Sequence, residues 1–492
     1  MNLFDWKRRQ EGTLERLLDV KVGAQSVERF APLVGAERVR ELLDKAEELK
    51  RFKGRAFWTV NSTAVGGGVA EMLRPLLAYV RGMGVDVRWL VIQGDDEFFH
   101  ITKRLHHALH GSEGDGSPLD ENARSAYEQT LARNSSELVK RIRPGDFVVL
   151  HDPQTAGLAP ALLEAGAEVV WRCHIGADHK GKEVERGWKF LRPYLKDVSA
   201  FIFSSQAYVP AECDHGKSTI IQPSIDAFSA KNQEMDEESV LAILMQVGLV
   251  EGPPPESSDP VFLLDDGSPG RVERGADLIR LGPAPHRDTP LVLQVSRWDP
   301  LKDHLGVMEG FTRMIEKHPA SDAHLVLAGP NVTAVADDPE GAQVFDDVLD
   351  AWRGLPHEHR RRIHLAMLPT TDVEENAAIV NALQRHARVV VQKSLHEGFG
   401  LTVTEAMWKA KPVLGSAVGG IQDQIQDCVN GRLLKDPSDL DEFAEILYEL
   451  LRDPEAAESL GRQAHETVRE KYLGMRHISE YMDLFRRMNG MA

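Results

Sequence analysis

The feature that most constrains this chain is a repeated alternation between short apolar runs and longer helical stretches. The first set of runs covers residues 56–60, 87–92, 147–150, 168–173 and 200–203. Most of them end in Gly, Ser, His or Asp. Continuous β-rich runs that alternate with helices are typical of a parallel sheet covered by helices on both faces. The sequence therefore predicts an α/β fold with a doubly wound sheet in this part of the chain.

The alternation stops at residues 251–290, which are rich in Pro and Gly, and then resumes. The second set of runs covers residues 291–295, 325–328, 363–367, 388–392 and 413–414. We therefore predict a Rossmann-like domain over 1–250, an irregular connection over 251–290 and a second Rossmann-like domain over 291–472. Residues 1–50 are expected to form a helical extension with Leu17 and Leu18 on an apolar face. Residues 473–492 are expected to form a last helix that could cross back to the first domain.

Composition excludes several classes of function. Lys and Arg number 58 against 76 Asp and Glu, which gives a net charge of −18 and argues against nucleic-acid binding. The three cysteines lie far apart and form no disulfide framework, which fits a cytoplasmic protein. Neither a signal peptide nor a membrane span is expected. No metal-ligand pattern is convincing, although His100, His106, His107 and His110 cluster in the sequence.

Ligands of doubly wound sheets sit beyond the carboxyl ends of the strands, and two such domains suggest a cleft between them. The loop after the run at 56–60 contains Gly66, Gly67 and Gly68. Its backbone amides and the following helix N-terminus suit a phosphate, although the loop matches neither a dinucleotide fingerprint nor a P-loop. The alternative is a tight strand-to-helix turn without a ligand.

Two loops of the second domain carry the strongest signals. Arg297 and Lys302 follow the run at 291–295 and could converge on a diphosphate, unless Lys302 simply pairs with Asp299 or Asp303. Glu397 and Glu405 flank a glycine-containing loop at the start of a helix. Two carboxylates around an anion site could hold hydroxyls on either side of a phosphate, as a nucleotide sugar requires. The alternative is that Glu397 is a cap and Glu405 an ordinary helix-surface residue.

Polar side chains also follow two runs of the first domain. His174 follows the run at 168–173, and Asp152 and Gln154 follow the run at 147–150. A histidine in this position faces the expected cleft, whereas a satisfied core histidine is the alternative. Asp152 and Gln154 offer groups suited to sugar hydroxyls, whereas an Asp-Pro turn is equally compatible with the sequence.

Taken together, these motifs resemble the family-four retaining glycosyltransferases, whose GT-B fold consists of two Rossmann-like domains facing a cleft. The glutamate pair, the Arg/Lys pair and the glycine loop occur in that family's order. A narrower resemblance points to the trehalose glycosyltransferring synthases, and retaining trehalose phosphorylases are similar to these. The stretches that carry it are 94–106, 151–154, 171–174 and 392–394.

The resemblance implies that glucose is transferred from a nucleoside-diphosphate glucose to glucose, forming trehalose. It implies catalytic roles for His174, Arg297, Lys302 and Glu397, and acceptor contacts from Asp152 and Gln154. The donor would be held by Arg297 and Lys302 together with Gly67, Gly68, Phe399, Gly400, Leu401 and Glu405. No cofactor is expected to be required, the use of a divalent cation such as Mg²⁺ is left open, and a homodimer is conceivable. The alternatives are a phosphorylase that uses inorganic phosphate and a non-catalytic sugar-nucleotide-binding protein.

Overall fold

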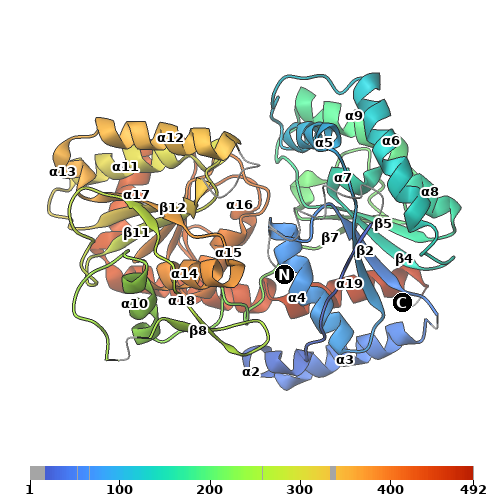
Figure 1. Ribbon diagram of the computed structural model, residues 1–492, viewed down its shortest axis with the longest axis horizontal. Helices are drawn as coiled ribbons and strands as arrows, with labels where there is room; N and C mark the ends of the chain where they lie inside the picture. The colour runs from blue at the N-terminus through green and yellow to red at the C-terminus, as the bar shows by residue number, and fades with distance from the viewer. Residues whose placement is uncertain (1–16, 53, 66, 257–258, 333–338, 491–492) are drawn as a thin grey trace. The chain divides into compact units, whose positions relative to one another are not determined.

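Two seven-stranded sheets organise the part of the chain that the computed structural model describes, which is residues 17–52, 54–65, 67–256, 259–332 and 339–490. Each sheet belongs to one of two units (Figure 1). Unit 1 comprises Met1–Ser224 and Tyr472–Ala492, and unit 2 comprises Ile225–Lys471. Residues 225–250, which the sequence assigned to the first domain, thus belong to unit 2, and residues 472–492 belong to unit 1.

The sheet of unit 1 has the strand order β1-β3-β2-β4-β5-β6-β7, and all neighbours except β1 and β3 are parallel. Its strands are β1 (Leu18–Val20), β2 (Phe57–Asn61), β3 (Val87–Val91), β4 (Phe147–His151), β5 (Glu168–Cys173), β6 (Ala200–Phe203) and β7 (Ser218–Ile220). Its helices are η1 (Val27–Phe30), α2 (Ala31–Val34), α3 (Ala36–Lys50), α4 (Gly68–Gly82), α5 (Asp96–Leu109), α6 (Glu121–Leu138), α7 (Asp152–Ala156), α8 (Ala159–Glu164), α9 (Lys182–Leu195), η2 (Gln206–Tyr208) and α19 (Gly474–Met488). Helices α5, α6 and α9 cover one face, and α3, α4 and α19 cover the other (Figure 1).

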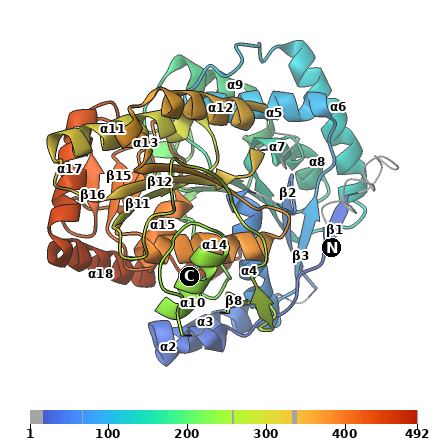
Figure 2. The ribbon, with the colours of Figure 1, turned by 60° about the vertical axis from the view of Figure 1, so that its left-hand side comes forward.

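The sheet of unit 2 repeats this plan with the order β10-β13-β12-β11-β14-β15-β16, in which only β10 is antiparallel to its neighbour. The strands of unit 2 are β8 (Val261–Leu263), β9 (Pro269–Arg271), β10 (Asp277–Ile279), β11 (Leu291–Val295), β12 (His324–Pro330), β13 (Ile363–Leu368), β14 (Val389–Gln392), β15 (Val413–Ser416) and β16 (Arg432–Leu434). Its helices are α10 (Glu237–Gln246), η3 (Pro300–Lys302), α11 (His304–Lys317), α12 (Pro339–Gly354), α13 (His357–Arg360), α14 (Val373–His386), α15 (Leu401–Trp408), α16 (Ile421–Gln424), α17 (Leu440–Arg452) and α18 (Pro454–Lys471). Helices α11 and α12 lie on one side of the sheet, and α14 and α18 lie on the other (Figure 2).

Buried side chains explain why these segments form strands. Strands β2, β4 and β11 are buried along their whole length, as expected for the central strands of a sheet covered on both faces. All ten apolar runs that were predicted as strands lie in strands of the structure, with ends that differ by a few residues at most. The doubly wound fold class predicted from the alternation is therefore confirmed for both units.

Two local predictions are wrong. Leu18 lies in the edge strand β1, paired with Val91, whereas the sequence indicated a polar helix at this point; helix α3 does form further along. The connection over 251–290 is not wholly irregular, because it contains the β8–β9 hairpin and the edge strand β10. Such three-residue strands carry too short a pattern to read locally, and pairing with a neighbouring strand decides them.

The strand order places a topological switch point in each unit. In unit 1 the chain winds in opposite directions from β2 and β4, and in unit 2 from β11 and β14. Ligands of open α/β sheets bind beyond the carboxyl ends of the strands at this point. The loops that follow these four strands are therefore the ones to examine for function. None of the described helices has the length and apolar character needed to cross a bilayer.

Candidate functional site

The loop after β11 is held rigidly before it reaches Lys302. The Asp299 carboxylate accepts a hydrogen bond from the Leu301 amide at 2.8 Å and starts the short helix η3. The buried Gln294 on β11 donates its side-chain amide to the Lys302 carbonyl at 2.9 Å. The Leu395 amide, from the loop after β14, donates to the Leu301 carbonyl at 2.8 Å. The backbone of Lys302 is thus fixed against both β11 and its neighbour β14.

The Lys302 side chain reaches the paired-glutamate loop. Its Nζ lies 2.5 Å from Glu397 Oε2, and the two side chains are only 16% and 11% exposed. Ser394 Oγ donates to the same Glu397 oxygen at 3.2 Å. Lys302 therefore contacts Glu397 rather than Asp299 or Asp303, the partners expected if the loop were only a solvated turn.

Arg297 lies on the same loop but is not brought to the glutamates. Its side chain is 68% exposed, and its guanidinium donates to Asp299 at 3.1 Å. An exposed pair of this kind is weak, so the guanidinium can leave Asp299 for a phosphate at low energetic cost.

The glycine-containing loop leads directly into α15. Gly400 is the N-cap residue of α15 and has a left-handed backbone with φ of 84°. The left-handed φ favours glycine, and a Cβ atom here would lie 3.2 Å from Glu397 Cγ and 3.3 Å from Ile421 Cγ1, so a larger residue would push on both side chains. The Gln424 side chain donates to the Phe399 carbonyl at 2.5 Å and fixes the loop from the far side. The amide of Leu401 therefore opens α15 in a position suited to an anion.

Glu405 lies on α15 and is 5% exposed, so it is not an ordinary surface residue. Its Oε1 lies 3.8 Å from Nζ of Lys231, a residue of the segment just after Ser224. Lys409, one turn further along, donates to Asn232 Oδ1 at 3.0 Å and to the Glu405 carbonyl at 3.1 Å. Burial lowers the pKa of Lys409 to about 7, against the opposing effect of the Glu405 charge. The segment 231–232 is thus part of the surroundings of Glu405, a contribution that sequence reasoning missed.

In unit 1 the structure brings Asp152 and His174 together. Asp152 follows β4, and its Oδ1 accepts a hydrogen bond of 2.7 Å from the His174 amide after β5. Asp152 has a positive φ of 63°, a strained conformation for a residue with a Cβ, and such strain clusters at functional sites. Burial raises the pKa of Asp152 to about 7, in spite of the His174 amide and the Arg172 charge.

The imidazole of His174 is held by a buried network. His174 Nε2 lies 3.0 Å from His151 Nδ1 and 3.3 Å from Arg172 Nε. Burial and the Arg172 charge lower the pKa of both histidines, that of His151 to about 3, so both rings are neutral near pH 7. Arg172 is fully buried, donates to the Ile221 carbonyl at 2.8 Å and lies over the Tyr481 ring of α19. The role of Arg172 and α19 in supporting His174 was not predicted, because α19 is far away in sequence.

The remaining predicted residues of unit 1 frame the same end of the sheet. Gly67 has a φ of 80° and is the N-cap residue of α4, which begins at Gly68 directly after the β2 loop. Gly66 lies outside the described residues. Gln154 is half-buried on the short helix α7, two residues after Asp152.

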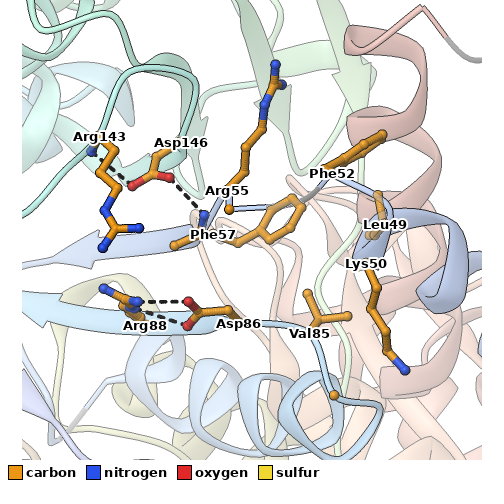
Figure 3. Close-up of a pocket in the computed structure, with 13 residues that line it drawn as sticks. Leu49, Lys50, Phe52, Arg55, Phe57, Val85, Asp86, Arg88, Arg143 and Asp146 are labelled. Atoms are coloured by element: carbon orange, nitrogen blue, oxygen red, sulfur yellow. Dashed lines mark hydrogen bonds and ion pairs between the residues drawn. The ribbon is translucent and has the colours of Figure 1, made fainter.

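A separate pocket of about 230 Å³ lies at the opposite edge of this sheet, at the amino ends of β2, β3 and β4 (Figure 3). Its acidic residues already have partners. Asp146 accepts hydrogen bonds from the Ala56 amide and from Trp58 Nε1, and Asp86 accepts two from Arg88. None of the predicted site residues lines it. We therefore interpret this pocket as a gap between the starts of neighbouring strands and not as part of the candidate site.

Comparisons with known proteins identify the family that this chain resembles. Residues 59–210 match a family model described as the N-terminal domain of trehalose synthase, and residues 282–467 match glycosyl transferases group 1. The chain is 35% identical to the trehalose synthase of Pyrococcus horikoshii over 95% of this chain and 98% of that protein. It is 27% identical to the trehalose phosphorylase of Pleurotus pulmonarius over 87% of this chain but only 56% of that protein.

Among solved structures, a UDP-forming α,α-trehalose-phosphate synthase from Burkholderia vietnamiensis superposes with a TM-score of 0.65 at 15% identity, over 89% of this chain and 99% of that one. At this identity the likeness concerns the fold. The two Rossmann-like units are those of the GT-B glycosyltransferase fold.

Proposed function

This chain belongs to the trehalose synthase family of glycosyltransferases, and from that premise we propose that it transfers glucose from a nucleoside-diphosphate glucose to glucose, with retention at the anomeric carbon. The observation that carries the proposal is the contact between Lys302 and Glu397 at the switch point of unit 2. A cation beside a carboxylate fits a diphosphate joined to a hexose, because the cation can hold the diphosphate and the carboxylate can accept a hydrogen bond from a sugar hydroxyl.

The chemical barrier is the cleavage of an anomeric C–O bond to a diphosphate. Negative charge grows on the departing diphosphate, and positive charge grows on the sugar ring. Fixed donors aimed at that developing negative charge are the main way to lower such a barrier. We assign this work to Lys302, to Arg297 after it leaves Asp299, and to the backbone amides around Phe399, Gly400 and Leu401. The fixed backbone of Lys302 supports the assignment, because a preorganised cation needs little rearrangement in the reaction.

Glu397 is assigned a positioning role on the donor sugar and not a nucleophilic one. One of its oxygens already accepts hydrogen bonds from Lys302 and Ser394, which reduces its nucleophilicity. In the proposed reaction the acceptor hydroxyl forms the new bond to the anomeric carbon while the bond to the diphosphate breaks on the same face. The acceptor proton passes to the departing phosphate oxygen. Glu405 would hold the ribose hydroxyls of the donor.

Residues of unit 1 are assigned to hydrogen bonding with the sugar hydroxyls. His174 is neutral, so it can exchange hydrogen bonds with a hydroxyl without bringing a charge. Asp152 and Gln154 lie on the neighbouring loop and are proposed as acceptor contacts, and the amides of Gly67 and Gly68 add donors.

The proposal is tested by incubating the purified protein with a panel of nucleoside-diphosphate sugars and acceptors, and by assigning the linkage of the product by NMR. An α,α-1,1-linked disaccharide from a nucleoside-diphosphate glucose and glucose is the expected product. Supplying trehalose with inorganic phosphate tests the alternative phosphorylase, which would release glucose 1-phosphate. Nucleotide-sugar binding without turnover for every acceptor would indicate the non-catalytic alternative. The similarity is greater to a synthase, at 35% identity over 98% of that protein, than to a phosphorylase, at 27% identity over 56% of that protein, which favours the synthase.

A further inference from the structure

The loops after β11 and β14 are joined by two ion pairs of opposite polarity. Lys302 of the first loop binds Glu397 of the second, and the next residue, Asp303, binds Lys393 of the second. Each loop therefore supplies one cation and one carboxylate. Strands β11 and β14 are hydrogen-bonded neighbours, which explains why residues 90 and 95 positions apart meet here.

Of the two lysines in these ion pairs, Lys393 is more deeply buried than Lys302. The Lys393 side chain is 1% exposed and that of Asp303 is 18% exposed. Asp303 has a left-handed backbone with φ of 51°, and its other oxygen caps α11 by accepting from the Gly306 amide at 3.1 Å. A Cβ atom on Gly306 would lie 2.6 Å from Lys393 Nζ and would also collide with the Asp303 carboxylate. The absence of a side chain at Gly306, in the first turn of α11, therefore leaves the space that this ion pair occupies.

Lys302 and Asp303 bind different residues of the facing loop, Glu397 and Lys393 respectively. Lys302 would be a natural partner for Asp303 if Lys393 were absent, because the two are adjacent in the chain. A carboxylate in a poorly solvated position does not stay unpaired when a cation is within reach. Competition from Asp303 would draw the Lys302 ammonium away from Glu397.

We propose that Lys393 is a positioning residue, which occupies the Asp303 carboxylate and thereby keeps Lys302 directed at the diphosphate of the donor. This inference rests on the proposed function, because it assigns Lys302 to the diphosphate. In this assignment Lys393 does not contact the substrate, because its side chain is 1% exposed and pairs with Asp303. Its effect is exerted through Asp303 and reaches the reaction only at Lys302.

The test compares Lys393→Met with the double variant Lys393→Met/Asp303→Asn. Binding of UDP, ADP, GDP and TDP is measured by calorimetry, and kcat and KM are measured with the donor that the wild type uses. Lys393→Met should weaken binding of the preferred nucleoside diphosphate by about tenfold or more and lower kcat. The double variant should recover binding to within about threefold, because Asn removes the competing charge while still favouring a left-handed cap. A purely structural role for Lys393 would not give this recovery.

Glu375→Gln is the matched control. Glu375 is 2% exposed and forms an ion pair in unit 2 with Arg274, whose side chain is 44% exposed; neither residue belongs to the two loops. This variant should lower thermal stability and leave nucleotide binding unchanged.

Unchanged binding in Lys393→Met, or a double variant as impaired as the single one, would overturn the inference. If Lys393→Met does not fold, the double variant decides: binding within about threefold of the wild type supports the inference, and binding weakened by about tenfold or more overturns it. Failure of the wild type to bind any of the four nucleotides would instead contradict the proposed function.

Discussion

At the scale of single residues, the candidate site depends on which partner each charged group takes. Lys302 binds Glu397 although two aspartates flank it in the sequence. The fixed carbonyl of Lys302 and the pairing of Asp303 with Lys393 account for that choice. Arg297, in contrast, is exposed and holds only a weak partner. The structure thus presents one preorganised cation and one that can move to a ligand.

Lys302→Ala should lower both kcat and kcat/KM, because the interaction it removes is strongest in the transition state. Loss of one such fixed donor costs about 10²–10³-fold in kcat. Steady-state kinetics with varied donor measures the effect, and Lys302→Arg serves as the charge-preserving comparison. A kcat equal to that of the wild type would remove Lys302 from the leaving-group role.

Glu405→Gln should chiefly weaken nucleotide binding. The substitution preserves volume at a buried position and removes a charged acceptor, which contributes about 1.5–3 kcal/mol per hydrogen bond. A loss of roughly 10- to 100-fold in the affinity for a nucleoside diphosphate is expected by calorimetry. Equal affinity in wild type and variant would show that Glu405 does not hold the ribose.

At the scale of elements, the start of α15 is the position where backbone conformation and site chemistry meet. Gly400 adopts a left-handed conformation, and the space beside its Cα is taken by the Glu397 and Ile421 side chains. The glycine therefore allows the loop to turn into the helix without displacing Glu397. A motif of Gly-Phe-Gly between two glutamates is readable in sequence, but the reason for the second glycine is visible only in the packing.

Gly400→Ala should destabilise this turn by about 1–2 kcal/mol, the cost of a left-handed residue with a Cβ. It should also lower kcat, because the new methyl group displaces Glu397. Gly354→Ala, at the end of α12, is the control: nothing lies within 4 Å of a Cβ there, so stability and activity should be unchanged or slightly improved. Denaturant unfolding and kinetics on both variants make the comparison. Equal behaviour of the two variants would contradict the account of α15.

At the scale of the whole molecule, buried neutral histidines tie stability to pH. Burial is the first cause of a lowered pKa at His151, His174, His304, His324, His364, His386 and His477. These groups remain neutral in the folded chain while the unfolded chain takes up protons below about pH 6.5. The contribution of these histidines to the free energy of unfolding is present above pH 6.5 and is lost as the pH falls toward their folded pKa values. These are about 3 to 4 for His151, His304, His324, His364 and His386.

The protein should therefore lose stability steeply between pH 6.5 and about pH 4. Each buried histidine contributes a slope of up to about 1.4 kcal/mol per pH unit. Asp152 has a raised pKa of about 7 and acts in the opposite direction, since its contribution is lost as the pH rises through that value. Urea unfolding at pH 8, 6 and 5 measures the net slope, and His364→Asn should flatten it. Equal stability at pH 8 and pH 5 would show that the histidines are not held neutral.

The sequence by itself determined the two doubly wound sheets and the loops that form the candidate site. Apolar runs and glycine-containing turns are local patterns, and each is read from a few consecutive residues. The same holds for Lys302, Glu397 and Asp152, which follow strands and so must lie at the carboxyl edge of a sheet.

Only the tertiary structure decided the edge strands, the place of residues 225–250 in unit 2 and the partners within the site. Lys231 with Glu405, and Lys393 with Asp303, are separated by many intervening residues, and no local pattern connects them. A buried charge takes its partner from whatever the packed strands bring near it, because desolvation makes an unpaired charge costly. Which side chains meet at a sheet edge is set by strand order, which is a property of the whole fold.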